Sequence, residues 1–146
     1  RTPLLLENVP GGGRRMGGPL EELARLHDAL KSRLPGIGVC LDTAHAYAAG
    51  YDCSSIEGSL KFVARAHRLL GPDAVKAFHL NDTRALLSSN REHHEHWGQG
   101  RLGREGLRAL LARDEFASVP GILEMPLGSV EQDAASLEWV RGLNAS

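Results

Sequence analysis

Acidic and imidazole side chains follow four short apolar runs of the sequence, each at the point where the run ends. The runs lie at 4–6, 37–41, 75–78 and 121–123, and the residues that follow them are Glu7, Asp42, His79 and Glu124. Three carboxylates that converge repel one another and are costly to desolvate unless a cation lies among them. Carboxylate and imidazole ligands together suit Zn²⁺ or Mn²⁺. The pattern predicts a divalent metal site, although one acidic residue after a strand is more often a helix cap.

Histidines supply a second group of candidate ligands. His45 comes three residues after Asp42, a spacing that could bring both side chains to one site from a turn after the strand. His93, His94 and His96 lie close together, and in an extended segment His94 and His96 would share a side. The competing interpretations are a solvated histidine-rich loop and, for His45, a buried hydrogen-bonding group.

The elements that must position these residues follow from hydrophobic periodicity. Strands are predicted at 4–6, 37–41, 75–80 and 121–123, and helices at 19–34, 55–70, 104–113 and 130–143. Strands that alternate with helices and are apolar on both faces indicate a parallel sheet covered by helices. The carboxyl ends of such strands meet at one face, where sites form.

Two features fall outside the candidate site. His27 and His67 lie in helical patterns and are interpreted as structural or exposed. The span 83–102 has no clear period, and a loop of that length inside a compact domain usually has a function or contains a short strand.

Length and composition exclude several classes of protein. The chain has 146 residues, 42% of them apolar and 24% charged, which is typical of one soluble globular domain. The formal charge of −1 excludes a basic nucleic-acid coat, so any nucleic-acid contact needs a local arginine patch. No apolar run could cross a bilayer and no secretory segment is evident. Cys40 and Cys53 form neither a disulfide framework nor a zinc knuckle, so we expect a reducing, cytoplasmic setting.

Five motifs resemble endonuclease IV, a family of zinc-dependent apurinic/apyrimidinic endonucleases. They read LEN at 6–8, CLDTAHAYAAGYD at 40–52, HLND at 79–82, HEHWGQG at 94–100 followed by LG at 102–103, and PGILE at 120–124. The motifs occur in family order and at family-like spacing over nearly the whole chain, so the resemblance is specific.

The resemblance implies an α/β fold, namely a TIM (β/α)₈-type barrel of the xylose isomerase-like superfamily with three zinc ions at the strand ends. A complete barrel needs about 250 residues. Residues 1–146 are therefore expected to be a single-domain fragment, a partial barrel that covers about the fourth to the eighth βα unit. Two family histidines that hold the remaining zinc belong to the earlier half and have no match here.

Two zinc sites are implied by matching position. The first is held by Glu7, Asp42, His79 and Glu124, and the second by His45, Glu92 and His94. The family normally has Asp-Arg-His where this sequence has Glu92, His93 and His94. The extra methylene of Glu92 moves its carboxylate, and the missing arginine removes a DNA contact or a support for the ligands.

The implied activity is hydrolysis of the DNA backbone 5′ to an abasic site, as part of base-excision repair. Glu7 and Glu124 are the expected catalytic residues, two or three zinc ions or Mn²⁺ the cofactor, and double-stranded DNA with abasic sites the partner. The expected phosphate contacts are Arg14, Arg15, Arg91 and Arg101. The complete enzyme is expected to be a monomer without membrane contact.

Two alternatives stay open. A sugar isomerase or epimerase of the same barrel superfamily would share the Glu-Asp-His-Glu quartet around one divalent metal, but it lacks the counterparts of His45 and of the His94 segment. A non-catalytic fragment is the other alternative, because half a barrel leaves two sheet edges and an apolar interior exposed.

Overall fold

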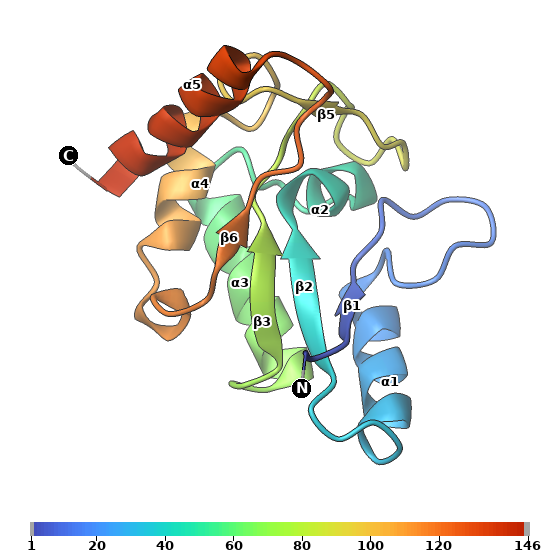
Figure 1. The fold of residues 1–146 in the computed structure, drawn as a ribbon. Coiled ribbons are helices and arrows are strands. Elements are labelled where there is room, and N and C mark those ends of the chain that lie inside the picture. Colours follow the sequence, from blue (N-terminus) through green and yellow to red (C-terminus); the bar gives the residue numbers. More distant parts are fainter. Residues whose placement is uncertain (1, 145–146) are drawn as a thin grey trace.

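A parallel sheet forms the centre of the computed structural model, which describes residues 2–144 (Figure 1). Its strands are β1 (Leu5–Glu7), β2 (Gly38–Asp42), β3 (Val75–His79) and β6 (Gly121–Ile122), in the order β1-β2-β3-β6. The four predicted strands are thus confirmed, with each boundary within one residue of the expected one. Glu7, Asp42 and His79 are the last residues of their strands, and the register pairs Asp42 with His79.

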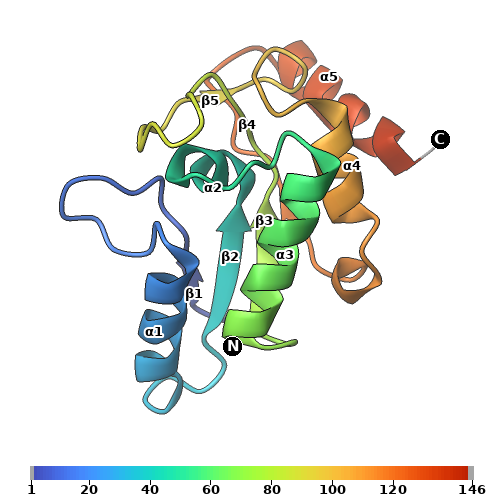
Figure 2. The same cartoon turned by 180° about the vertical axis from the view of Figure 1, so that it is seen from behind.

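Four longer helices connect and cover these strands. They are α1 (Leu20–Lys31), α3 (Ile56–Leu70), α4 (Gly103–Leu111) and α5 (Val130–Arg141). Helix α3 lies behind β2 and β3 in Figure 1 and in front of them in Figure 2, where its neighbours are α1 and α4. All five residues of β2 are buried, which explains why this strand reads as a continuous apolar run. In Figure 1 no helix lies in front of β2 and β3.

Helix α1 is shorter than predicted. The apolar spacing predicts a helix up to residue 34, but the helix ends at Lys31, and Leu34 is 41% exposed. Pro35 disfavours helical backbone in the residue before it, so the last leucine of the pattern lies in the turn at 32–36.

The segment after β2 is a helix, where the sequence predicts only a turn. Helix α2 (Thr43–Ala49) begins directly after Asp42, whose side chain accepts a hydrogen bond from the His45 amide at 2.7 Å. It ends at Ala49 and is capped by Gly50, whose φ of 110° only glycine adopts readily. One short helix therefore orients His45 relative to Asp42.

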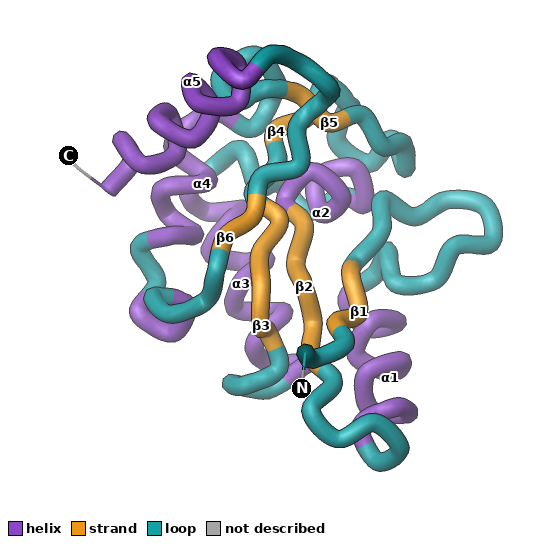
Figure 3. Tube along the Cα trace, viewed as in Figure 1, coloured by secondary structure: helices purple, strands orange, loops and turns teal. Residues whose placement is uncertain are grey.

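The span 83–102 contains the short strand that its length allowed. Strand β4 (Asp82–Thr83) pairs antiparallel with β5 (His94–Glu95), and Thr83 lies opposite His94. Figure 3 shows this loop and the loop between β1 and α1 at the end of the sheet where the parallel strands finish. Short 3₁₀ helices occur at Asp114–Phe116 and Gly142–Asn144. Among the helices of residues 2–144, none is both long and apolar enough to cross a membrane.

Candidate metal centre

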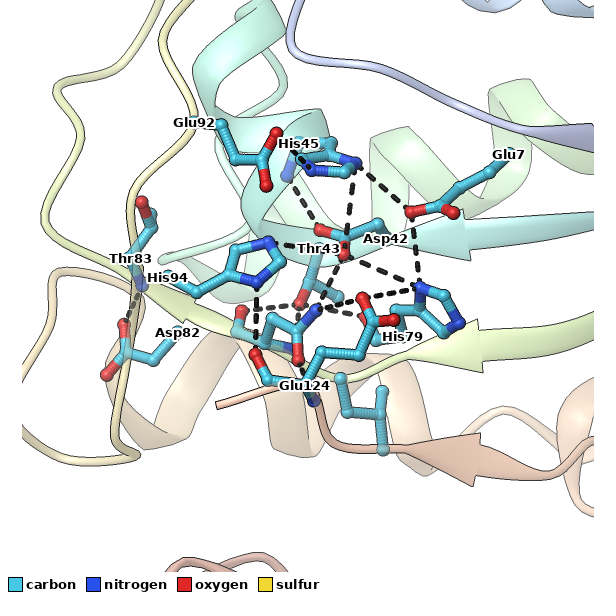
Figure 4. Close-up of polar contacts among 12 residues, drawn as sticks. Glu7, Asp42, Thr43, His45, His79, Asp82, Thr83, Glu92, His94 and Glu124 are labelled. Atoms are coloured by element: carbon cyan, nitrogen blue, oxygen red, sulfur yellow. Dashed lines mark hydrogen bonds and ion pairs between the residues drawn. The ribbon is translucent and has the colours of Figure 1, made fainter. Parts of the chain in front are cut away.

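Four side chains from four strand ends converge at one point (Figure 4). Site A is the group formed by Glu7, Asp42, His79 and Glu124, whose potential ligand atoms all lie within 4.8 Å of one another. The first three are strand-terminal residues, and Glu124 follows β6. The parallel sheet thus places together the quartet that the sequence pattern singled out.

One imidazole faces three carboxylates in site A. His79 Nδ1 lies 3.1 Å from Glu7 Oε1, 3.0 Å from Glu124 Oε2 and 3.8 Å from Asp42 Oδ2. A single ring nitrogen cannot balance three negative charges, even when it is protonated. A divalent cation among these oxygens would remove the repulsion between them.

A second group shares Asp42 with the first. Site B consists of Asp42, His45 and His94, and its potential ligand atoms also lie within 4.8 Å of one another. Glu92 joins it from the loop, since its Oε2 lies 3.6 Å from His45 Nε2. The Glu92 side chain is 55% exposed, so it has room to adjust its carboxylate.

Hydrogen bonds fix which nitrogen each histidine of site B presents. His45 Nδ1 lies 2.9 Å from the Asn8 carbonyl oxygen, and His94 Nδ1 lies 3.0 Å from the Glu124 carbonyl oxygen. In the neutral form that binds metals, with the proton on Nδ1, each ring donates to its carbonyl and leaves the Nε2 lone pair free. Both Nε2 atoms are buried without a hydrogen-bond partner.

The Nε2 atoms of His45 and His94 show whether a metal fits this site. A buried donor or acceptor without a partner is destabilising by about 1–3 kcal/mol. Histidines that bind metals commonly donate their other ring N–H to a carbonyl, which is the arrangement of His45 and His94. The donor set of imidazole and carboxylate therefore fits a divalent cation of the zinc type.

Burial and charge act in opposite directions on the protons of the site. Burial raises the pKa of Asp42, and the neighbouring histidines only partly offset this effect. Burial opposes the charged form of His45, but its hydrogen bond to Glu7 and the charge of Asp42 outweigh that and raise its pKa to about 9. Burial also opposes ionisation of Glu7, yet His45 and His79 lower its pKa overall. The carboxylates thus favour positive charge at this position.

Two asparagines hold the ligands in place, a role that the sequence motifs did not reveal. Asn8 accepts the Asp42 N–H at 2.7 Å and donates to the Asp42 carbonyl at 3.0 Å. Asn81 donates to Asp42 Oδ2 at 2.6 Å and accepts the Glu124 N–H at 2.7 Å. The available signal was their position in the sequence, one residue after Glu7 and two after His79, because a buried carboxylate requires donors.

The three clustered histidines have different environments. Only His94 reaches the ligand groups, while His93 is exposed. His96 is buried, with its Nδ1 3.5 Å from the Ser136 hydroxyl of α5. The extended stretch of β5 ends at residue 95, so the condition for a shared side of His94 and His96 is not met, and His96 does not join the ligand groups. His27 is buried and His67 is exposed, as their helical positions suggested.

The arginines expected to contact DNA are all exposed. Arg14 and Arg15 lie in the loop between β1 and α1, and Arg91 lies in the loop between β4 and β5. A hydrogen bond from Asn90 Nδ2 to the Pro10 carbonyl joins these two loops at 2.9 Å. Arg101 Nε donates to the Arg84 carbonyl at 2.9 Å, so part of its guanidinium is already engaged.

Known proteins match this chain over nearly its whole length. A family model described as xylose isomerase-like TIM barrel matches residues 1–143. Two relatives named as probable endonuclease 4 are 41% identical over 96% of this chain (Geobacter sulfurreducens) and 40% identical over 97% of it (Chloroflexus aurantiacus). The crystal structure of endonuclease IV from Thermus thermophilus has a TM-score of 0.87 and 39% identity over 99% of this chain. The chain spans about half the length of these proteins, from 47% to 51%.

Proposed function

The chain belongs to the xylose isomerase-like TIM barrel family, and from this premise we propose that its metal centre is that of a DNA-repair endonuclease of the endonuclease IV type. The reaction is hydrolysis of a phosphodiester 5′ to an abasic site. The observation that carries the proposal is site B, with its two buried, unpartnered imidazole nitrogens beside site A. A single-metal sugar isomerase of this barrel needs the quartet of site A and has no use for site B.

The candidate ligands form two sets, one for each of two cations. Asp42, His79 and Glu124 would hold one of them, and His45, Glu92 and His94 would hold the other. Zinc suits these donors best, and Mn²⁺ is the alternative. Cations bound there would supply Lewis-acid stabilisation of the phosphate charge and a more acidic water.

Glu7 spans the two sites. Its Oε1 lies 3.2 Å from His45 Nδ1 in site B and 3.1 Å from His79 Nδ1 in site A. We assign to it the orientation of the attacking water, which replaces any nucleophilic side chain. Glu124 is the second catalytic carboxylate, because its side chain is 46% exposed and can face the substrate phosphate. Asn8 and Asn81 keep the shared ligand Asp42 in place.

Duplex DNA with an abasic site is the proposed partner, bound by the complete protein as a monomer. With a net charge of −1, the chain has to use local contacts, for which Arg14, Arg15, Arg91 and Arg101 are the candidates. The face of the sheet that no helix covers in Figure 1 would face the remainder of the barrel.

The Arg14→Ala variant is expected to weaken DNA binding equally for all sequences. Removal of one phosphate contact makes the negative slope of log affinity against log salt concentration shallower by about 1. The measurement is fluorescence anisotropy of a labelled abasic duplex at several salt concentrations. Arg33→Ala, an exposed arginine in the turn after α1, serves as the control. An unchanged slope for Arg14→Ala would remove this residue from the interface.

Cleavage of an abasic duplex tests the proposed function directly. We expect a zinc-dependent break 5′ to the abasic site that leaves a 3′-hydroxyl. The same test is applied to a hybrid in which this chain replaces the matching half of the Thermus endonuclease IV, since the two superpose over 99% of this chain. Turnover of a ketose with the DNA left intact would favour the isomerase instead, and an inactive hybrid would contradict the proposal.

A further inference from the structure

A buried carboxylate outside both sites gathers the backbone of the loop that carries part of site B. Asp82 is 0% exposed. Its Oδ1 accepts the amide N–H of Thr83 at 2.8 Å and of Leu102 at 3.0 Å. Its Oδ2 accepts the amide N–H of Gly98 at 3.2 Å and of Gly100 at 3.0 Å. One side chain therefore satisfies four backbone donors.

These four donors come from both ends of one loop. Thr83 begins it, and Gly98, Gly100 and Leu102 end it, so Asp82 draws the last part of the loop back onto its start. A backbone hydrogen bond from Arg101 to the Thr83 carbonyl at 2.8 Å closes the same ring. Between the two ends lie Glu92 and the short strand β5, whose first residue is His94.

The packing around Asp82 leaves no space for a larger neighbour. A Cβ atom added to Gly100 would lie 2.2 Å from Asp82 Oδ1 and 2.4 Å from its carboxyl carbon. Gly100 is thus required by close approach and not by its backbone angles, because its φ is outside the positive range. The end of the loop at 98–102 packs tightly against the Asp82 carboxylate, and the two together are called the Asp82 unit.

We propose that Asp82 is a positioning residue for site B. It holds the end of the loop against β4, and the pairing of Thr83 with His94 passes that placement to the ligand. Asp82 itself lies outside the groups that can hold a cation, which in residues 2–144 are sites A and B. This inference rests on the proposed function, since site B matters only where a second cation binds.

Two variants disturb the Asp82 unit from opposite sides. Asp82→Asn keeps the shape but turns an amide group toward backbone donors, which leaves some of them without an acceptor. Gly100→Ala keeps the carboxylate and displaces the loop. In both variants we expect the zinc affinity of site B to fall ~10–100-fold, while site A binds zinc as before. Asp73→Asn and Gly142→Ala are the controls, because Asp73 is exposed and a Cβ at Gly142 meets nothing within 4 Å.

Zinc titration and amide hydrogen exchange on the metal-free chain are measured together. Support for the inference is a selective loss at site B with faster exchange at Gly98, Gly100 and Leu102. A merely structural role would weaken both sites and lower the melting temperature together. Wild-type affinity for both cations in the variants would overturn the inference. If the unaltered chain binds no cation at site B, the proposed function fails. In that case amide exchange still tests the role of Asp82 in the loop, and unchanged exchange in Asp82→Asn overturns it. Should Asp82→Asn not fold, Gly100→Ala decides.

Discussion

The Glu124→Gln variant is expected to lose the cation of site A, and with it DNA cleavage, while it keeps its fold. Glutamine has the shape of glutamate but no charge, and the affected oxygen lies 3.0 Å from His79 Nδ1. The backbone N–H of residue 124 still donates to Asn81, so the position of the residue is maintained. Loss of one anionic ligand should reduce zinc affinity at site A by at least ~100-fold, more than typical changes around a metal site.

Zinc titration with a competing chelator measures this loss, and circular dichroism checks the fold. Glu57→Gln is the matched control, because Glu57 is exposed and forms only a surface pair with Lys61 at 2.5 Å. Such exposed pairs contribute little to stability. A Glu124→Gln variant with wild-type zinc affinity and cleavage would exclude this carboxylate from the site.

The His94→Gln variant is expected to lose the other cation, again with loss of cleavage. Its Nε2 is buried, unpartnered, and 3.6 Å from Asp42 Oδ2. The unpartnered Nε2 contributes no hydrogen bond in the absence of a cation, and a glutamine amide can donate to the Glu124 carbonyl in place of Nδ1, so the replacement should change the stability of the metal-free chain little. In the presence of zinc the variant should be less stable than the wild-type chain, since the wild-type chain gains binding free energy that the variant cannot gain.

Thermal melting with and without zinc measures the stability difference between the variant and the wild-type chain under both conditions. His93→Gln is the control next in sequence, because His93 is exposed and outside both sites. We expect the His93 variant to gain the same zinc-induced rise in melting temperature as the unaltered chain. An equal rise in His94→Gln would show that His94 holds no cation.

The strands and the quartet of site A could be predicted because each depends on local sequence. An apolar run followed at once by a charged residue specifies both a buried strand and the side chain at its end, as for Asp42 and β2. The short helix α2 was missed because its boundaries depend on the Asp42 side chain and on Gly50, not on an apolar pattern. Propensity is a weak signal over so few residues.

Contacts between distant residues account for what the sequence did not reveal. Asn8 lies 34 residues from Asp42, and Asn81 lies 39 residues from it, yet both bind this one residue. The four amides bound by Asp82 likewise become visible only when the loop is folded. No spacing rule links an asparagine to a partner on another strand, so these roles required the structure. The arginine contacts remain predictions, since DNA binding alone can test them.

The zinc content of the folded chain tests the central claim most directly, namely that acids and imidazoles at the strand ends tolerate each other because cations lie among them. The measurement is equilibrium dialysis against dilute zinc, followed by elemental analysis of the protein. We predict two zinc ions per chain, both removed by excess chelator together with any cleavage activity. A folded chain that takes up no zinc, or cleavage that persists in excess chelator, would contradict the account.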